Sequence, residues 1–286
     1  MLSGGGSLGA IQVGMLQALT ESGIRPELLI GTSVGAVNAG WMAEHPDHEG
    51  ALALGDIWMG LRRNHVFPLS PWAGARGLLG RTNHLVSNSG LRQILETHLT
   101  YENLEDARVP LHVITTDLKT GRAVVVSSGP VIPALLASSA IPGVFPPVRI
   151  GKRDLVDGGI ANHAPIAAAI ELGASEIYVL PGGYPWLARE PSSALGMALY
   201  ALARFVEQKL EVEVMANRHR ALIHVLPTFE LPPITPADFS QTRELIARGQ
   251  RWARRYLGAP ATTVSKPQRS REQRLPALAP TPARAA

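Results

Sequence analysis

One serine lies in a pentapeptide that is typical of nucleophilic hydrolases. The pattern G-x-S-x-G is formed by Gly31, Thr32, Ser33, Val34 and Gly35. It follows the short apolar segment 28–30 and precedes segment 36–44, which reads as a helix, and this is the context that the pattern requires. Its glycines permit a sharp turn, so we expect the Ser33 hydroxyl at the head of a helix whose dipole favours negative charge. An ordinary strand-to-helix turn can carry the same residues, so the pattern indicates a nucleophile only if a base lies beside the serine.

A glycine-rich segment near the beginning of the chain is a candidate oxyanion hole. It consists of Gly4, Gly5, Gly6, Ser7, Leu8 and Gly9. Segment 7–22 has apolar residues at helical spacing, and backbone amides at a helix start can hold a developing oxyanion. The spacing also fits a dinucleotide fingerprint, but that motif requires an acidic residue after the next strand, where this chain has Ser33 and its neighbours. The dinucleotide alternative is therefore disfavoured.

The candidate base is Asp157, which ends a strand-like segment and is followed by Gly158 and Gly159. The glycines let the backbone approach another loop closely. A free aspartate has a pKa near ~3.9 and is a weak base toward serine, so its surroundings must compensate. Because Asp-Gly is also a common turn, this segment is informative only together with the other two.

In this order, the three segments resemble the patatin-like phospholipase family. Residues 4–9 match its oxyanion motif, residues 31–35 its nucleophile motif and residues 157–159 its Asp-Gly-Gly motif; segment 138–147, and Asn162 with Pro165, are also similar to that family. The resemblance covers roughly residues 1–180 and implies a Ser-Asp dyad that cleaves acyl esters of lipids, either phospholipids or lysophospholipids. It implies that Ser33 takes the acyl group and Asp157 accepts and returns the proton, without a metal, a cofactor or a histidine.

The alternation of expected elements indicates an α/β protein with a mostly parallel sheet covered by helices on both faces. Strand-like segments are 28–30, 111–116, 123–126, 155–156, 176–180 and 222–226, and further helix-like segments are 52–63, 91–99, 133–139, 164–172, 194–216 and 239–257. The resemblance likewise implies a three-layer α/β/α sandwich. Only three residues precede the glycine-rich segment, where the family has a full strand, so we expect a truncated N-terminal strand. The family usually has Arg or Lys at the position of Leu8.

We expect one domain over residues 1–258, which the resemblance implies is a hydrolase domain, and composition predicts a basic, proline-containing, disordered tail over 259–286. The tail carries all of the net charge of +4, so the body is neutral and we expect no nucleic-acid partner. The chain has no cysteine, which excludes a thiolate nucleophile and favours the cytoplasm. No charge-free apolar run reaches the ~18 residues of a membrane span. We therefore expect a lipid substrate and at most peripheral membrane contact, through the tail or the loop around Trp72; the oligomeric state is not indicated.

Two other functions stay open. An α/β-hydrolase with a Ser-His-Asp triad shares the serine pattern, and His163, His219 and His224 lie late enough in the chain to act as its base, although several strands precede the serine in that fold. The second is a non-catalytic lipid-binding or regulatory protein on the same fold, which is favoured by Leu8 in place of a cation and by the short segment before the glycine-rich residues. A metal site at His45, Asp47 and His48 is disfavoured, because a solvated turn explains these residues better.

Overall fold

The computed structural model describes residues 1–68, 83–161, 165–183, 210–228 and 235–258, with residues 197, 200 and 201. The loop around Trp72, the residues Asn162 and His163, and the tail 259–286 lie outside the described residues. The helices are η1 (Gly6–Leu8), α1 (Gly9–Glu21), α2 (Val34–Glu44), α3 (His48–Gly60), α4 (Arg63–Val66), α6 (Ser89–His98), η2 (Leu104–Asp106), α7 (Val131–Ser138), α8 (Ile166–Glu171) and α10 (Thr242–Gly258). The strands are β1 (Leu29–Thr32), β2 (Leu111–Asp117), β3 (Ala123–Val126), β4 (Val148–Ile150), β5 (Arg153–Asp157), β6 (Glu176–Val179) and β7 (Leu222–Val225).

The sheet is mixed, and the expectation of a mostly parallel sheet was wrong. β1 pairs with β2 in parallel, and β6 with β7, but β2 pairs antiparallel with both β3 and β5, and β4 pairs antiparallel with β5. For two of the three antiparallel pairs the physical reason is connection length, because β2–β3 and β4–β5 are joined by short turns and a short turn can join only antiparallel neighbours. The expected pairing of segments 111–116 and 123–126 across a turn is confirmed.

The residues at the start of the chain join the two groups of strands. Leu2 forms parallel bridges to Gly31 and to Leu180. Its amide donates to Ile30 O at 2.8 Å, and the Ser3 amide donates to Leu180 O at 3.2 Å. Leu2 thus lies between β1 and β6 and continues the sheet from one to the other.

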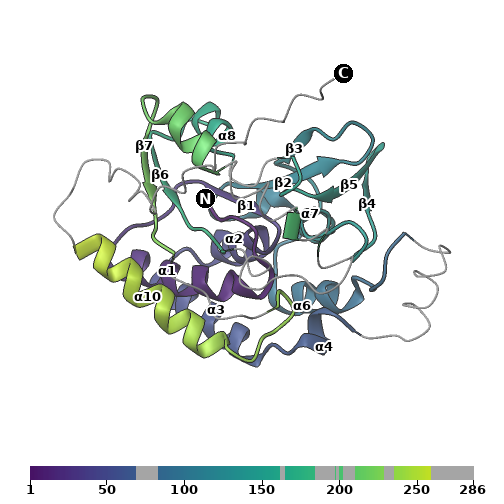
Figure 1. Ribbon diagram of the computed structural model, residues 1–286, viewed down its shortest axis with the longest axis horizontal. Helices are drawn as coiled ribbons and strands as arrows, with labels where there is room; N and C mark the ends of the chain where they lie inside the picture. Colours follow the sequence, from purple (N-terminus) through teal and green to yellow (C-terminus); the bar gives the residue numbers. More distant parts are fainter. Residues whose placement is uncertain are drawn as a thin grey trace, which may run out of the picture.

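Helices cover both faces of this sheet. Alternate residues of one strand point to opposite faces, and the core divides accordingly: Leu29 and Val113 belong to one buried cluster, Ile30 and Ile114 to another. The first cluster includes residues of α1, α2, α3, α6, α7 and α10, and the second includes residues of α8 and β6. Figure 1 shows α1, α3 and α10 together on one side of the strands and α8 on the other.

Helix α1 is the most enclosed helix of the first layer, with every residue from Gly9 to Leu19 buried. Helix α10 lies against it through two glycines. A Cβ at Gly14 would lie 2.0 Å from Ile246 O, and a Cβ at Gly249 would lie 2.3 Å from Ile11 O. The two backbones therefore touch, and α10 is held firmly against the helix that follows the glycine-rich segment.

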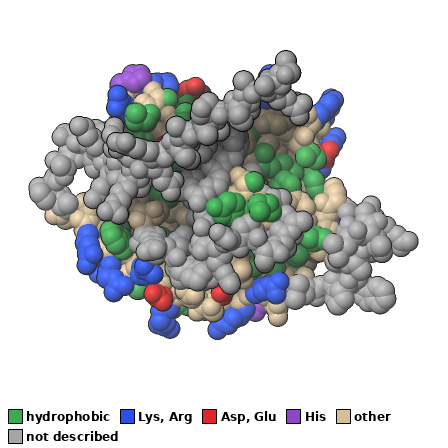
Figure 2. All heavy atoms as spheres, in the orientation of Figure 1, with side chains coloured by type: hydrophobic (Ala, Val, Ile, Leu, Met, Phe, Trp, Pro, Cys, Tyr) green, Lys and Arg blue, Asp and Glu red, His purple; other side chains and the backbone are tan. Residues whose placement is uncertain are grey.

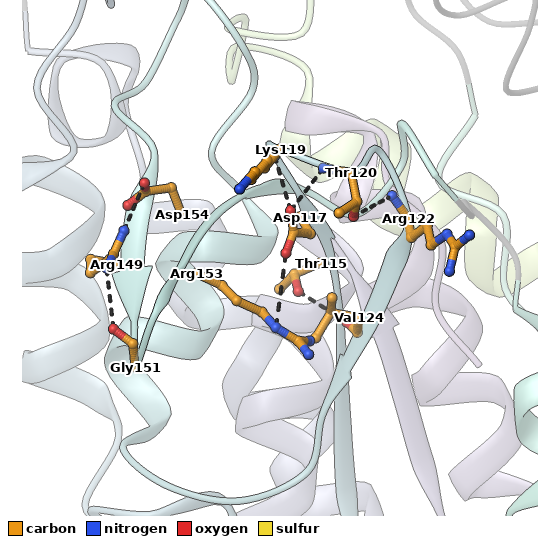
Figure 3. Close-up of polar contacts among 10 residues, drawn as sticks. All are labelled: Thr115, Asp117, Lys119, Thr120, Arg122, Val124, Arg149, Gly151, Arg153 and Asp154. Atoms are coloured by element: carbon orange, nitrogen blue, oxygen red, sulfur yellow. Dashed lines mark hydrogen bonds and ion pairs between the residues drawn. The ribbon is translucent and has the colours of Figure 1, made fainter.

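A group of polar contacts fixes the turn after β2 (Figure 3). Asp117 Oδ1 accepts from the amides of Lys119 and Thr120 at 2.9 and 3.0 Å, and Arg153 lies 3.9 Å from Asp117. The Thr120 amide is the largest cause that holds the pKa of Asp117 below its ordinary value. The ion pair with Arg153 is partly exposed and adds little stability. The amide hydrogen bonds to Asp117 fix the turn that joins β2 to β3.

Among the described residues, no helix combines the length and the hydropathy needed to cross a bilayer.

Candidate active site

Strand β2 brings Ser33 and Asp157 to adjacent positions. Thr32, at the end of β1, pairs with Ile114, and the next residue of β2, Thr115, pairs with Asp157 at the end of β5. Ser33 follows Thr32 directly, so it flanks β2 at the level of Asp157. Both residues are buried, each with 8% of its surface exposed.

The pentapeptide around Ser33 forms a sharp turn from strand to helix. Ser33 has φ 57° and ψ −128°, and it is the only residue other than glycine with a positive φ among the described residues. Such a conformation costs on the order of 1–3 kcal/mol and persists only where the surroundings enforce it. A Cβ at Gly31 would lie 2.3 Å from Ala36 Cα, and one at Gly35 would lie 2.4 Å from Leu2 O. The glycines are therefore required because α2 folds back over β1 and beside Leu2.

The carboxyl group of Asp157 has an altered acidity. Burial raises the pKa of Asp157 to about 6, while hydrogen bonds from the Ser33 side chain and the Gly159 amide act in the opposite direction. The Gly159 amide lies 2.8 Å from Asp157 Oδ1. A carboxylate with this pKa is a stronger base than a free aspartate and is still ionised at neutral pH. A Cβ at Gly158 would lie 2.3 Å from Ile114 O, so the Asp-Gly-Gly segment passes directly over β2.

Ser138, at the end of α7, links the parts of this site. Its Oγ accepts from the Ser33 amide at 2.8 Å and donates to Ile114 O at 2.6 Å. Its backbone oxygen accepts from the Gly158 amide at 3.4 Å. Sequence reasoning assigned no role to Ser138; the only signal was its place in segment 138–147, which is similar to the family.

The glycine-rich segment lies beside Ser33, but only part of it has amides available. The Ser7 amide donates to Pro236 O at 2.8 Å, the Leu8 amide donates to Gly5 O at 3.2 Å, and the Gly9 amide donates to backbone oxygens of η1. Within the described part of the chain, the amides of Gly4, Gly5 and Gly6 have no acceptor. The candidate oxyanion donors are therefore Gly4, Gly5 and Gly6.

Leu8, where the family usually has a cation, is fully buried. It belongs to the apolar core of the first layer.

A buried polar network positions this segment. Gln12 of α1 donates from Nε2 to Ser3 O at 2.7 Å and to Leu180 O at 3.0 Å. Asn38 of α2 donates from Nδ2 to Gly9 O at 3.1 Å, and its Oδ1 accepts from Trp58 Nε1 at 2.8 Å. No sequence motif pointed to Gln12, Asn38 or Trp58 as part of the site. A satisfied buried network of this kind holds its members in one geometry, here the loop relative to the helix that begins after Ser33.

An apolar cavity opens next to Ser33 and Gly6. Its volume is about 100 Å³, whereas one water molecule needs about 10–15 Å³. Many of its lining residues come from α2, α3 and α6, and the lining is largely aliphatic or aromatic, with Val37, Trp41, Leu54, Ile57, Trp58 and Leu95 among its residues. The Ser139 hydroxyl also belongs to this wall and is buried without a hydrogen-bond partner. Such a cavity suits a hydrocarbon chain whose polar end stays at Ser33.

The histidines proposed as triad bases lie elsewhere or outside the described residues. His224 contacts Glu176 Oε1 at 3.1 Å and the Tyr256 hydroxyl at 3.2 Å. His219 is exposed in the turn after helical residues 210–217. In the part of the chain that the structure describes, no imidazole forms a hydrogen bond with Asp157 and none contributes to the shift of its pKa.

The residues considered for a metal have separate structural partners. Asp47 Oδ1 accepts from the Gly50 amide at 2.8 Å and so caps α3, and His48 Nδ1 lies 3.1 Å from Thr20 Oγ1. His45 packs against Trp41, with 4.3 Å between ring centroids. The described residues include no group of three or more His, Asp or Glu side chains placed to hold a metal.

Comparison with known proteins identifies the family. A family model described as patatin-like phospholipase matches residues 1–170. The chain belongs to this family. It is 31% identical over 180 residues to the patatin-like phospholipase domain-containing protein ZK370.4 of Caenorhabditis elegans, and 27% identical over 191 residues to Lysophospholipase NTE1 of Mycosarcoma maydis. An uncharacterized NTE family protein of Mycobacterium bovis is 32% identical over 171 residues.

These likenesses cover 61%, 64% and 58% of this chain, but only 13%, 9% and 27% of the relatives. The chain therefore matches one part of much longer proteins.

The raised pKa of Asp157 predicts a pH-dependent effect of Asp157→Asn on stability. The pKa of Asp157 in the folded state, about 6, lies above the ordinary aspartate value of 3.8, so the folded state binds the proton more tightly than the unfolded chain. The contribution of this group to stability is complete below pH ~4 and is lost as the pH rises through about 6. A shift of about two pKa units corresponds to roughly 3 kcal/mol.

Asp157→Asn should therefore raise the melting temperature at pH 7.5, and this gain should vanish near pH 4. The exposed Asp154→Asn variant is the control and should show no such pH-dependent gain. Equal or lower melting temperatures for Asp157→Asn at pH 7.5 would contradict the burial of a charged carboxylate.

The contacts of Ser138 predict different effects for neighbouring serines. Ser138→Ala would leave the Ser33 amide and Ile114 O without their partner, and an unpaired buried group costs about 1–3 kcal/mol. Ser139→Ala removes a hydroxyl that has no partner and should leave the free energy of unfolding unchanged or higher. Urea denaturation measures both, and similar losses for the two variants would count against the assigned role of Ser138.

Proposed function

We propose that the chain is a hydrolase of lipid acyl esters, with Ser33 as nucleophile and Asp157 as its base. The observation that carries the proposal is the contact of the Ser33 side chain with a buried carboxyl group whose pKa is about 6, beside an apolar cavity. Family membership and the name of one relative, a lysophospholipase, favour a lipid ester as substrate.

The first half-reaction acylates Ser33. Asp157 accepts the hydroxyl proton while Ser33 Oγ attacks the ester carbon, and the carbonyl oxygen becomes an oxyanion. The free amides of Gly4, Gly5 and Gly6 are the candidate donors to that charge, and a donor of this kind is worth about 2.7–4 kcal/mol of barrier. When the tetrahedral intermediate collapses, Asp157 gives its proton to the departing alcohol.

The second half-reaction restores the enzyme. Asp157, again ionised, accepts a proton from a water molecule that attacks the acyl-serine ester. Collapse of the second intermediate releases the fatty acid, and the proton returns to Ser33 Oγ. The acyl chain occupies the apolar cavity in both steps, because burial of each methylene contributes about 0.8 kcal/mol.

Hydrolysis of p-nitrophenyl octanoate tests the proposal. For the wild type, kcat/KM should rise with pH through about 6, because only ionised Asp157 can accept the proton. Ser33→Ala should abolish turnover, and Asp157→Asn should lower it by about 10²–10⁴-fold, the usual contribution of a general base. His224→Asn is the matched control and should keep activity, because His224 contacts Glu176 and Tyr256 rather than Asp157.

Hydrolysis that survives Ser33→Ala would refute the proposal. Binding of lipid without turnover of any ester would instead favour the non-catalytic alternative. Loss of activity in His224→Asn would favour the triad alternative.

A further inference from the structure

The apolar cavity next to Ser33 follows helix α2 away from the catalytic serine. Ser33 is the N-cap of α2, and Val34, Val37 and Trp41 lie along one face of that helix and line the cavity. Trp41 is the last residue of α2 among the described lining residues, although the helix continues to Glu44. The cavity therefore extends from Ser33 to the level of Trp41.

Residues of α3 and α6 end the cavity at the same level. Leu54 is the first lining residue of α3, one turn after Gly50, whose oxygen accepts a hydrogen bond from Trp41. His98 is the last residue of α6, and its ring centroid lies 6.4 Å from that of Trp41 in an edge-on arrangement. We call the part of the lining formed by Trp41, Leu54 and His98 the deep end.

Contacts between the helices hold the deep end closed. Trp41 Nε1 donates to Gly50 O at 2.8 Å, and the Trp41 ring packs against His45 with 4.3 Å between ring centroids. A Cβ at Gly50 would lie 2.2 Å from His45 O, so the end of α2 and the start of α3 touch directly. The Thr100 amide, just after α6, donates to Glu44 Oε2 at 3.3 Å. Turning the Trp41 ring aside would therefore break a hydrogen bond and a ring contact.

The length of the cavity limits the acyl chain that it can hold. Trp41 lies about 12 Å further along α2 than Ser33, at ~1.5 Å per residue. An extended chain of single bonds advances about 1.2 Å per bond, as the protein backbone does with three bonds per ~3.5 Å. About ten carbons therefore reach from Ser33 to Trp41. The volume of about 100 Å³ is likewise small, since a cavity of ~150 Å³ accommodates benzene.

The other direction open to a hydrocarbon chain is less favourable. A second cleft adjoins the cavity on the side where Pro236 and Phe239 line both spaces. Three arginines also line this cleft: Arg62, Arg63 and Arg243. Figure 2 shows cationic side chains along the edge of the molecule where Figure 1 places α10 and α4. The described lining of the cavity contains no Asp, Glu, Lys or Arg, so a hydrocarbon chain gains most from burial in the cavity.

We propose that Trp41 closes the apolar cavity and limits the acyl group to about ten carbons, so that the enzyme favours esters of medium-chain over long-chain fatty acids. This inference rests on the proposed function, which places the ester at Ser33 and the acyl chain in the cavity. Methylenes between Ser33 and Trp41 gain from burial, whereas further methylenes find no space beyond Trp41 and have to bend back toward water. Trp41 takes no part in the chemistry and determines only which acyl chains fit.

The test measures kcat/KM for the p-nitrophenyl esters of octanoic and tetradecanoic acid, at concentrations where both are monomeric. The wild type should prefer the octanoate. In Trp41→Ala the ratio of tetradecanoate to octanoate activity should rise, roughly fourfold for each methylene that the enlarged cavity newly accepts. This ratio does not depend on how much of a variant is folded, so a loss of stability leaves the test valid. Trp41→Phe, which keeps a smaller ring at this position, should give a smaller rise.

Trp252→Ala is the matched control, because it makes the same substitution on α10 at a position that does not line the cavity. It should keep the wild-type ratio. Equal activity of the wild type on the two esters, or a ratio that Trp41→Ala leaves unchanged, would overturn the inference while the proposed function stands.

A binding measurement separates the inference from turnover. If neither ester is hydrolysed, the proposed function fails, and the Kd values of the Ser33→Ala variant for the two esters decide the inference. The octanoate should then bind more tightly than the tetradecanoate, and adding Trp41→Ala should reduce that difference. Equal Kd values for the two esters would overturn the inference as well.

Discussion

The site depends on one buried contact, that of the Ser33 hydroxyl with a carboxylate shielded from water. In water Asp157 would be a weak base, but burial raises its pKa to about 6. Charge burial of this kind opposes folding at neutral pH, so the surrounding structure must hold the carboxylate in place. Strand β2 does this, because β1 and β5 pair with successive residues along one of its edges, while β3 pairs with the other edge. The end of β1 and the end of β5 therefore meet, and Ser33 and Asp157 lie at adjacent levels.

Close backbone approach is the second constraint, and it explains the glycines better than flexibility does. Gly31, Gly35 and Gly158 each lie where a Cβ would come within 2.4 Å of another backbone atom. The same tight packing occurs between α1 and α10, at Gly14 and Gly249. Since Pro236, just before α10, binds the glycine-rich segment, the position of this segment depends on the far end of the described chain as well as on the sheet.

The sequence alone could predict the residues that carry local patterns. Ser33, the glycine-rich segment and Asp157 lie in short motifs, and most helices and strands follow from the spacing of apolar residues. The direction of β5 could not be obtained in this way, because an Asp-Gly-Gly motif does not state how its strand pairs. Nor could the roles of Ser138, Gln12 and Asn38, since each depends on partners that the fold brings from other elements. For the same reason, the sequence could not show that the amides of Ser7, Leu8 and Gly9 donate to backbone oxygens while those of Gly4, Gly5 and Gly6 do not.

Covalent labelling with a fluorophosphonate measures the central contact most directly, because the reagent reports nucleophilicity at the serine itself without requiring a matching lipid. Peptide mass mapping should place the adduct on Ser33, and the labelling rate should increase as the pH rises through about 6 and collapse in Asp157→Asn. An adduct on another serine, or a rate at Ser33 that neither follows this ionisation nor depends on Asp157, would contradict the account.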